Sequence, residues 1–226
     1  MIAVAFCPAP PVLLPEVEGR ASAETTALRH ACAEAVSGML AVLPEVVVVV
    51  ADGVADGVRF GPGDAGDLRG WGVDLDLPFA GPAWPHGRRV PLAHALGARL
   101  LDDAGYAGVR VGLGPEDLAQ LVRDLPGPLA VLAMGEGSAR RTVKAPGYLD
   151  AAAEPFDASV VRALAEGDPA ALAALDVAEG RRLLATGVPT WRAVGAALAG
   201  RAVTARLHVD AAPFGVGYVV ADWMAA

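Results

Sequence analysis

Val46-Val47-Val48-Val49-Val50, followed at once by Ala51-Asp52-Gly53, is the stretch that decides the fold of this chain. β-Branched side chains favour the extended backbone of a strand. Neither alternate set of positions in the run is polar, so both faces of the strand need cover from other elements. The run therefore predicts a central strand of a sheet packed between two layers, and it is far too short to span a bilayer.

Strands and helices are predicted to alternate along the rest of the chain. Further strands are expected over residues 2–6, 109–113, 129–134, 202–209 and 217–222, with a short one within 71–77. Helices are expected over residues 22–43, 92–104, 115–125, 158–166, 169–175, 178–185 and 190–198, with Ser22 or Thr25 capping the first and Pro91 at the first position of the second. This order predicts one three-layer α/β domain over residues 1–226, with a central mainly parallel or mixed sheet covered by helices on both faces.

Composition narrows the class of partner. The 226 residues are 54% hydrophobic and 19% charged, as in a folded globular protein, and the formal net charge is -8. An acidic surface disfavours nucleic acid and anionic membrane as partners. Cys7 and Cys32 are too few for a disulfide framework and predict reduced thiols. The start of the chain has no basic segment before its apolar run, so we expect a cytoplasmic protein without a signal peptide.

The candidate chemistry lies in four loops. Three of them, at residues 7–13, 51–60 and 135–141, follow predicted strands, and ligands of open α/β sheets gather at the carboxyl ends of strands. The fourth is Trp84-Pro85-His86-Gly87-Arg88-Arg89-Val90-Pro91-Leu92, which places a histidine in a loop just before a helix. An imidazole with an ordinary pKa near 6.5 suits acid or base work.

This fourth loop resembles the Asp-His-Gly-x-x-Val-Pro-Leu loop of the class III extradiol dioxygenase family, in which the loop histidine faces the substrate beside a non-haem iron. The resemblance extends to the loops that hold the family's iron ligands. Ala9 stands where the first loop has a histidine, Asp52 follows the strand that leads to the second histidine, and Ala139 stands at the histidine of the turn Met134-Gly135-Glu136-Gly137-Ser138-Ala139-Arg140. The region around Thr190, which is comparable to the family's carboxylate ligand, offers no Glu.

A closer resemblance is to a group of bacterial proteins in the superfamily of the protocatechuate 4,5-dioxygenase beta chain, here called the beta-chain-like group. It rests on Gly137-Ser138-Ala139-Arg140-Arg141-Thr142-x-Lys144-Ala145-Pro146-Gly147-Tyr148-Leu149-Asp150, on Glu154-Pro155-Phe156-Asp157, and on Ala212-Pro213-Phe214-Gly215-Val216-Gly217-Tyr218. The resemblance implies the three-layer fold of the class III extradiol dioxygenases and, in an active member, Fe(II)-dependent opening of a catechol-like ring. Subunits of this family pair, so it also implies a possible homo- or hetero-oligomer.

Several of these polar side chains allow two interpretations. Arg140, Arg141 and Lys144, with glycines nearby, could form an anion pocket, or the arginines could pair with Asp150, Glu154 or Asp157 in a solvated loop. Ser138 lacks the Gly-x-Ser-x-Gly turn of a nucleophile. Likewise His86 could face a ligand or only bond a backbone carbonyl. His30, His94 and His208 have no metal-ligand spacing and are expected to be structural.

These observations lead to one principal hypothesis. We expect a divergent family member without the iron site and without a cofactor, which binds a small molecule or a partner in a pocket at Ala9, Asp52, Glu136, Ser138 and Arg140, with His86 as the candidate catalytic residue. Fe(II)-dependent oxygenation, with Fe(II) as the cofactor, is one alternative. Metal-independent chemistry with His86 as acid or base is the other.

Overall fold

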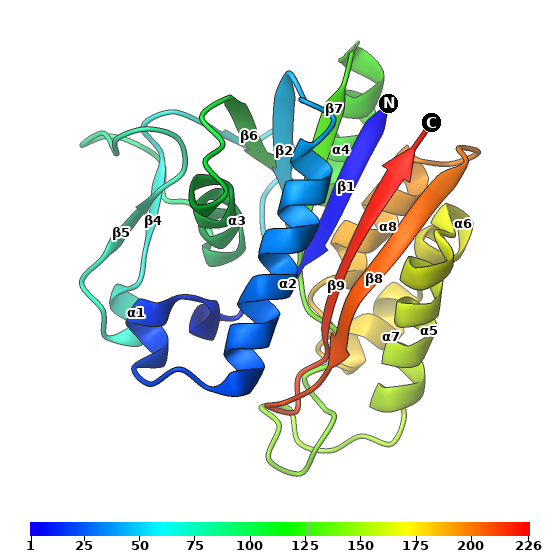
Figure 1. Ribbon diagram of the computed structural model, residues 1–226. Coiled ribbons are helices and arrows are strands. Elements are labelled where there is room, and N and C mark those ends of the chain that lie inside the picture. The colour runs from blue at the N-terminus through cyan, green and yellow to red at the C-terminus, as the bar shows by residue number, and fades with distance from the viewer. Residues whose placement is uncertain (126) are drawn as a thin grey trace.

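The computed structural model describes residues 1–125 and 127–226 and places one seven-stranded sheet between two layers of helices (Figure 1). The strands are β1 (Ile2–Cys7), β2 (Val46–Val50), β3 (Arg59–Phe60), β4 (Ala65–Asp67), β5 (Asp76–Pro78), β6 (Val109–Leu113), β7 (Leu129–Met134), β8 (Val203–Ala211) and β9 (Tyr218–Ala225). The α-helices are α1 (Pro15–Glu18), α2 (Ala23–Leu40), α3 (Leu92–Asp103), α4 (Pro115–Asp124), α5 (Ala153–Glu166), α6 (Pro169–Ala173), α7 (Val177–Arg182) and α8 (Val188–Ala197), with short 3-10 turns η1 (Pro11–Leu13) and η2 (Arg69–Trp71).

The sheet is mixed, in the order β3-β6-β2-β7-β1-β9-β8, and β4 and β5 form a separate two-stranded sheet. Its centre is parallel, because β6, β2, β7 and β1 all run in the same direction. The outer strands β9, β8 and β3 are antiparallel to their neighbours. The three-layer α/β fold expected from the pattern of apolar runs is therefore confirmed, including the mixed edge formed by the C-terminal strands.

The valines of β2 divide between two hydrophobic cores, which explains why neither face of the run is polar. Val47 and Val49 pack in the core under α2 and α3. Val48 and Val50 pack in the core on the opposite face, where Leu118 of α4 and Trp191 of α8 are buried. Because successive side chains of a strand point to opposite faces, five apolar residues in a row supply both cores from one strand.

The structure differs from the sequence-based prediction in several details, and the prediction does not include α1, β3 and β4. Instead of a strand over residues 71–77, the chain forms η2, a left-handed Gly72 with a φ of 79°, and then β5, because a residue with positive φ interrupts an extended strand. Helix α5 begins five residues earlier than expected, at Ala153, since Pro155 is tolerated in the first turn of a helix. Pro91 precedes α3 as its N-cap with an extended ψ of 150°.

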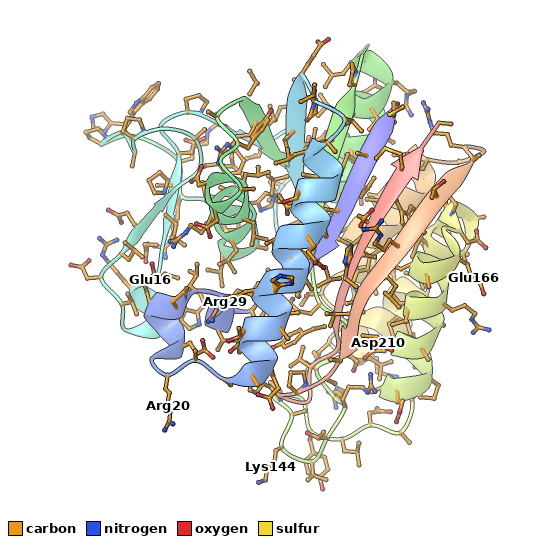
Figure 2. All side chains as sticks on the ribbon, viewed as in Figure 1. Glu16, Arg20, Arg29, Lys144, Glu166 and Asp210 are labelled. Carbon is orange, nitrogen blue, oxygen red and sulfur yellow. The ribbon has the colours of Figure 1, made fainter. Side chains whose placement is uncertain are left out.

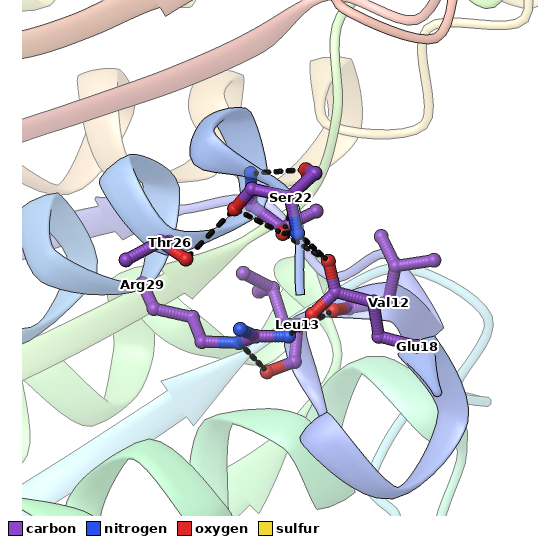
Figure 3. Close-up of polar contacts among 7 residues, drawn as sticks. Val12, Leu13, Glu18, Ser22, Thr26 and Arg29 are labelled. Atoms are coloured by element: carbon purple, nitrogen blue, oxygen red, sulfur yellow. Dashed lines mark hydrogen bonds and ion pairs between the residues drawn. The ribbon is translucent and has the colours of Figure 1, made fainter. Parts of the chain in front are cut away.

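The loop that carries Ala9 is fastened to α2 through a polar network (Figure 3). Arg29 of α2 donates from Nε to the carbonyl of Leu13 at 2.8 Å and from NH2 to the carbonyl of Val12 at 2.9 Å, and it also pairs with Glu18. Ser22 caps α2 as expected, since its hydroxyl accepts from the Thr25 amide at 3.1 Å. These contacts hold the proline-rich loop against α2, so the position of Ala9 does not depend on the loop alone.

Candidate functional site

The carboxyl ends of the parallel strands meet at the edge of the sheet that lies opposite both chain termini (Figure 1). Ala9 follows β1, Asp52 follows β2 and Glu136 follows β7 at this edge. Two loops come into direct contact there. The Gly135 amide donates to the Cys7 carbonyl at 3.0 Å, and the Gly187 amide donates to the Glu136 carbonyl at 2.8 Å. The structure thus brings together Ala9 and Glu136, two of the residues predicted for the pocket.

The Glu136 carboxylate is the centre of this edge. One oxygen, Oε1, accepts from the Ala9 amide at 2.8 Å. The other, Oε2, accepts from the Thr186 hydroxyl at 2.5 Å, and that hydroxyl in turn accepts from the Glu136 amide at 3.2 Å. These hydrogen bonds require the backbones of Gly135 and Gly187 to approach closely. Any side chain at Gly135 would prevent this approach, because its Cβ would lie only 2.4 Å from the Cα of Gly187. Both carboxylate oxygens are therefore held by groups far away in sequence.

Tyr218 joins this cluster from β9. Because β9 is antiparallel to β1, its first residue lies at the carboxyl end of β1, close to Ala9 and Glu136. Burial, together with the negative charge of Glu136, raises the pKa of Tyr218 to about 12. The phenol therefore stays protonated across the physiological range and can donate a hydrogen bond at this edge.

A cleft of about 190 Å³ opens beside this cluster, between the loop after β2 and the segment from α7 to α8. Its polar lining residues are Asp52, Arg181 and Thr186, all exposed. Its remaining lining residues are small or apolar: Val177, Gly180, Leu184, Ala185, Val188 and Pro189. Thr186 lines the cleft and also bonds Glu136, so the cleft adjoins the Glu136 cluster.

Ser138 and the loop that follows it have a structural arrangement. The Ser138 hydroxyl donates to the Leu183 carbonyl at 2.7 Å and accepts from the Arg140 amide at 3.1 Å. The Ser138 amide donates to the buried Asp157 carboxylate at 2.8 Å, and Arg141 pairs with the same carboxylate at 3.0 Å. Burial raises the pKa of Asp157, against the opposing effect of these two partners. The amide and hydroxyl of Ser138 are therefore used in hydrogen bonds that stabilise the loop.

Of the two arginines of this loop, Arg141 follows the pairing interpretation and Arg140 forms no ion pair within the described residues. Arg141 pairs with Asp157 and reaches Glu154 at 3.6 Å, so its charge is already compensated. The guanidinium Nε of Arg140 is buried and has no hydrogen-bond partner within residues 1–125 and 127–226. Figure 2 shows Lys144 projecting from the tip of the loop, away from the sheet, so these three side chains do not converge on one pocket.

His86 lies apart from the other predicted site residues. Its neighbour Trp84 lines a separate cleft of about 630 Å³ with Tyr106 and Gly108, which directly precede β6. Asp52, in contrast, lies near the carboxyl end of β6, because the Ala51 amide bonds the Leu113 carbonyl. At about 3.3 Å per residue, β6 separates its two ends by about 13 Å. His86 is exposed and does not line the cleft beside the Glu136 cluster described above, so the structure does not bring it to the pocket.

The other histidines have structural partners. His94 is fully buried, with Nε2 2.9 Å from the Leu113 carbonyl and its ring against the edge of Phe60. Its Nδ1 has no partner in the part of the chain that the structure describes, and burial lowers its pKa. His208 lies 2.5 Å from Asp222, between β8 and β9. None of these partners of His94 and His208 belongs to the Glu136 cluster.

The residues at the carboxyl edge do not fit a non-haem iron. Such sites generally combine two histidines with one carboxylate. Ala9 and Ala139 offer only methyl groups here, and both oxygens of Glu136 accept hydrogen bonds from other groups of the protein. Within the described residues no group of three or more His, Cys, Asp or Glu side chains could hold a metal ion.

Sequence reasoning missed three residues of this site: Arg181, Thr186 and Tyr218. Tyr218 is the last residue of one of the segments that resemble the beta-chain-like group, and this resemblance could have indicated Tyr218 as a site residue. Arg181 and Thr186 reach the edge through the long-range packing of the segment between α7 and α8, and no local pattern marks them.

The fold and the site together define a three-layer α/β protein with a polar cluster and a cleft at the carboxyl edge of its sheet. No family model matches the chain, and none of the curated proteins matches it. Among solved structures it is similar to a crystal structure of the uncharacterized protein JW3007 from Escherichia coli K12, with 15% sequence identity and a TM-score of 0.45 over 99% of this chain and 100% of that one. No helix among the described residues is long and apolar enough to cross a membrane.

Proposed function

We propose that this chain is a divergent class III extradiol dioxygenase-like protein that binds a small molecule at the carboxyl edge of its sheet, without the iron of that family. One observation carries the proposal. The Glu136 carboxylate is held between the Ala9 amide and the Thr186 hydroxyl, at the place where the loops resembling the family's ligand loops converge. Because Thr186 also lines the adjoining cleft, its hydrogen bond to Glu136 fixes one polar group of the cleft wall, and a few fixed polar groups orient a bound ligand.

Two alternatives have less support. Iron-dependent ring opening needs donor atoms that alanine does not have, and Ala9 and Ala139 occupy the positions in question. Metal-independent chemistry through His86 needs the imidazole within hydrogen-bond reach of the bound molecule. His86 is exposed and does not line the cleft, so the imidazole is not placed against a ligand bound there.

Binding is tested with a mixture of small organic acids, amines, amino acids and catechols, observed by saturation-transfer NMR. Leu184→Trp places a large side chain at the cleft, and Leu149→Trp is the matched control on the neighbouring loop, since both leucines are exposed. Loss of ligand signals in Leu184→Trp alone supports the cleft as the binding site. Equal signals in both variants and in the wild type would place binding elsewhere and contradict the proposal.

The iron alternative is tested by anaerobic titration calorimetry of the wild-type protein with Fe(II). We expect no saturable heat, because no set of suitable donors converges at this edge among the residues that the structure describes. Tight binding of about one ion per chain would overturn this part of the proposal and bring the oxygenase forward.

A further inference from the structure

Two opposite charges share the cleft beside the Glu136 cluster. Asp52 lines it from the loop after β2, and Arg181 lines it from α7. No ion pair or hydrogen bond joins either charged group to a partner in residues 1–125 and 127–226. The contrast with the next residue is informative, because Arg182 pairs with both Asp150 and Glu179. Asp52 and Arg181 are thus left to interact with what occupies the cleft.

Size and lining limit the occupant. Pockets for drug-sized ligands measure roughly 300–1,000 Å³. This cleft measures about 190 Å³ and has no aromatic side chain among its described lining residues, so it suits a small aliphatic molecule. Leu184, one of those residues, has a left-handed φ of 59°, a conformation that costs a non-glycine residue free energy and is concentrated at ligand sites.

We infer that the cleft binds a small aliphatic zwitterion, with its ammonium group against Asp52 and its carboxylate against Arg181. This inference rests on the proposed function and names the chemical class of its ligand. A molecule with both charges gains two charge-assisted hydrogen bonds. A ligand with only a negative charge would be repelled by the Asp52 carboxylate, and a ligand with only a positive charge would be repelled by the Arg181 guanidinium. The two charges together therefore select against either kind of ion.

The test is titration calorimetry of the full chain with glycine, β-alanine and γ-aminobutyrate, which differ in the spacing between amine and carboxylate. Propionate and propylamine are the single-charge analogues. We expect one zwitterion to bind with one-to-one stoichiometry and each single-charge analogue to bind at least about tenfold more weakly, since a hydrogen bond to a charged group contributes about 1.5–3 kcal/mol.

Two variants locate the charges. Asp52→Asn and Arg181→Gln should each weaken the zwitterion about tenfold or more, while Arg206→Gln, which changes an exposed arginine on β8, should leave the Kd unchanged. Melting temperatures close to that of the wild type would show that these surface variants are folded.

Two results would overturn the inference. If propionate binds as tightly as β-alanine and Asp52→Asn leaves both unchanged, the cleft takes an anion, and small-molecule binding survives without the zwitterion. If no zwitterion binds to the wild type at millimolar concentration, the ligand class is wrong. The comparison of Leu184→Trp with Leu149→Trp then decides separately whether the cleft binds a small molecule at all.

Discussion

Replacing Asp157 by alanine should destabilise the protein more than almost any other polar substitution near the site. Asp157 is 2% exposed, and its carboxylate accepts from the Ser138 amide and pairs with Arg141. Its removal leaves a buried amide without a partner and releases Arg141. Because Ser138 begins the loop that packs on Leu183, the loss should also loosen the loop beside the Glu136 cluster.

The size of the effect follows from the exposure of the two partners. Breaking a buried ion pair by removing one side chain costs about 3–5 kcal/mol. Arg141 is 18% exposed and keeps Glu154 at 3.6 Å, so water and that carboxylate offset part of the loss. We therefore expect a decrease of about 3 kcal/mol in the free energy of unfolding. For a chain of this length that lowers the Tm by about 6–12 °C.

Urea denaturation followed by circular dichroism measures this difference, and pH adds a second signature. Since burial raises the pKa of Asp157 in the folded state, proton binding adds an increment of stability beyond that of its hydrogen bonds. This increment is full below the unfolded-state pKa and is lost as pH rises through the folded-state pKa. Asp157→Asn does not titrate. The stability of the wild type relative to Asp157→Asn should therefore increase as the pH is lowered from neutral towards 4.

Glu154→Ala is the matched control, because Glu154 is an 80% exposed partner of the same arginine. An exposed ion pair contributes about 0–1 kcal/mol, so this variant should stay close to the wild type. The reasoning is refuted if Asp157→Ala and Glu154→Ala have the same free energy of unfolding. It is also refuted if the difference between wild type and Asp157→Asn does not depend on pH.

Three further predictions concern single residues outside this pair. The hydroxyl of Thr25 and the guanidinium of Arg29 hold the pKa of Glu18 at about 2. The ionised Glu18 carboxylate therefore stabilises the fold above its unfolded-state pKa, and this effect is lost as pH falls through about 2. Glu18→Gln should make the free energy of unfolding less dependent on pH in that range. Burial lowers the pKa of His94, so stability should decline as the pH falls below about 6.5, and His94→Leu should reduce that decline when unfolding is measured between pH 7 and 5. Leu43 is 84% exposed with a φ of 51°, so Leu43→Gly should raise the free energy of unfolding by about 0.5–1 kcal/mol, and a lower Tm for this variant would contradict the strain argument.

Local pattern was sufficient for six of the seven strands of the main sheet and for most helices. The predicted strands over 46–50, 109–113 and 129–134 agree with β2, β6 and β7 at both ends. Apolar runs of β-branched and aliphatic residues are short-range signals, and the prolines that end them act on their immediate neighbours. The same signals misplaced β5 and the start of α5, where a left-handed glycine and a tolerated proline decided the backbone.

The site was only partly predictable, for a reason that its contacts show. Parallel strands bring their carboxyl ends to one edge, so the sequence could place Ala9, Asp52 and Glu136 near one another. The loop with His86 follows β5, which belongs to a separate two-stranded sheet, and no local signal indicates to which edge such a loop returns.

The sequence by itself determined the two-sided core, because alternation of side chains along each strand is a local property. Only the tertiary structure decided what holds Glu136. Thr186 lies 50 residues away and Ala9 lies 127 residues away in sequence, and their hydrogen bonds exist because two glycine-containing loops approach closely at the sheet edge. Hydrogen bonds between groups so far apart in sequence depend on the packing of the whole domain, which local sequence patterns do not specify.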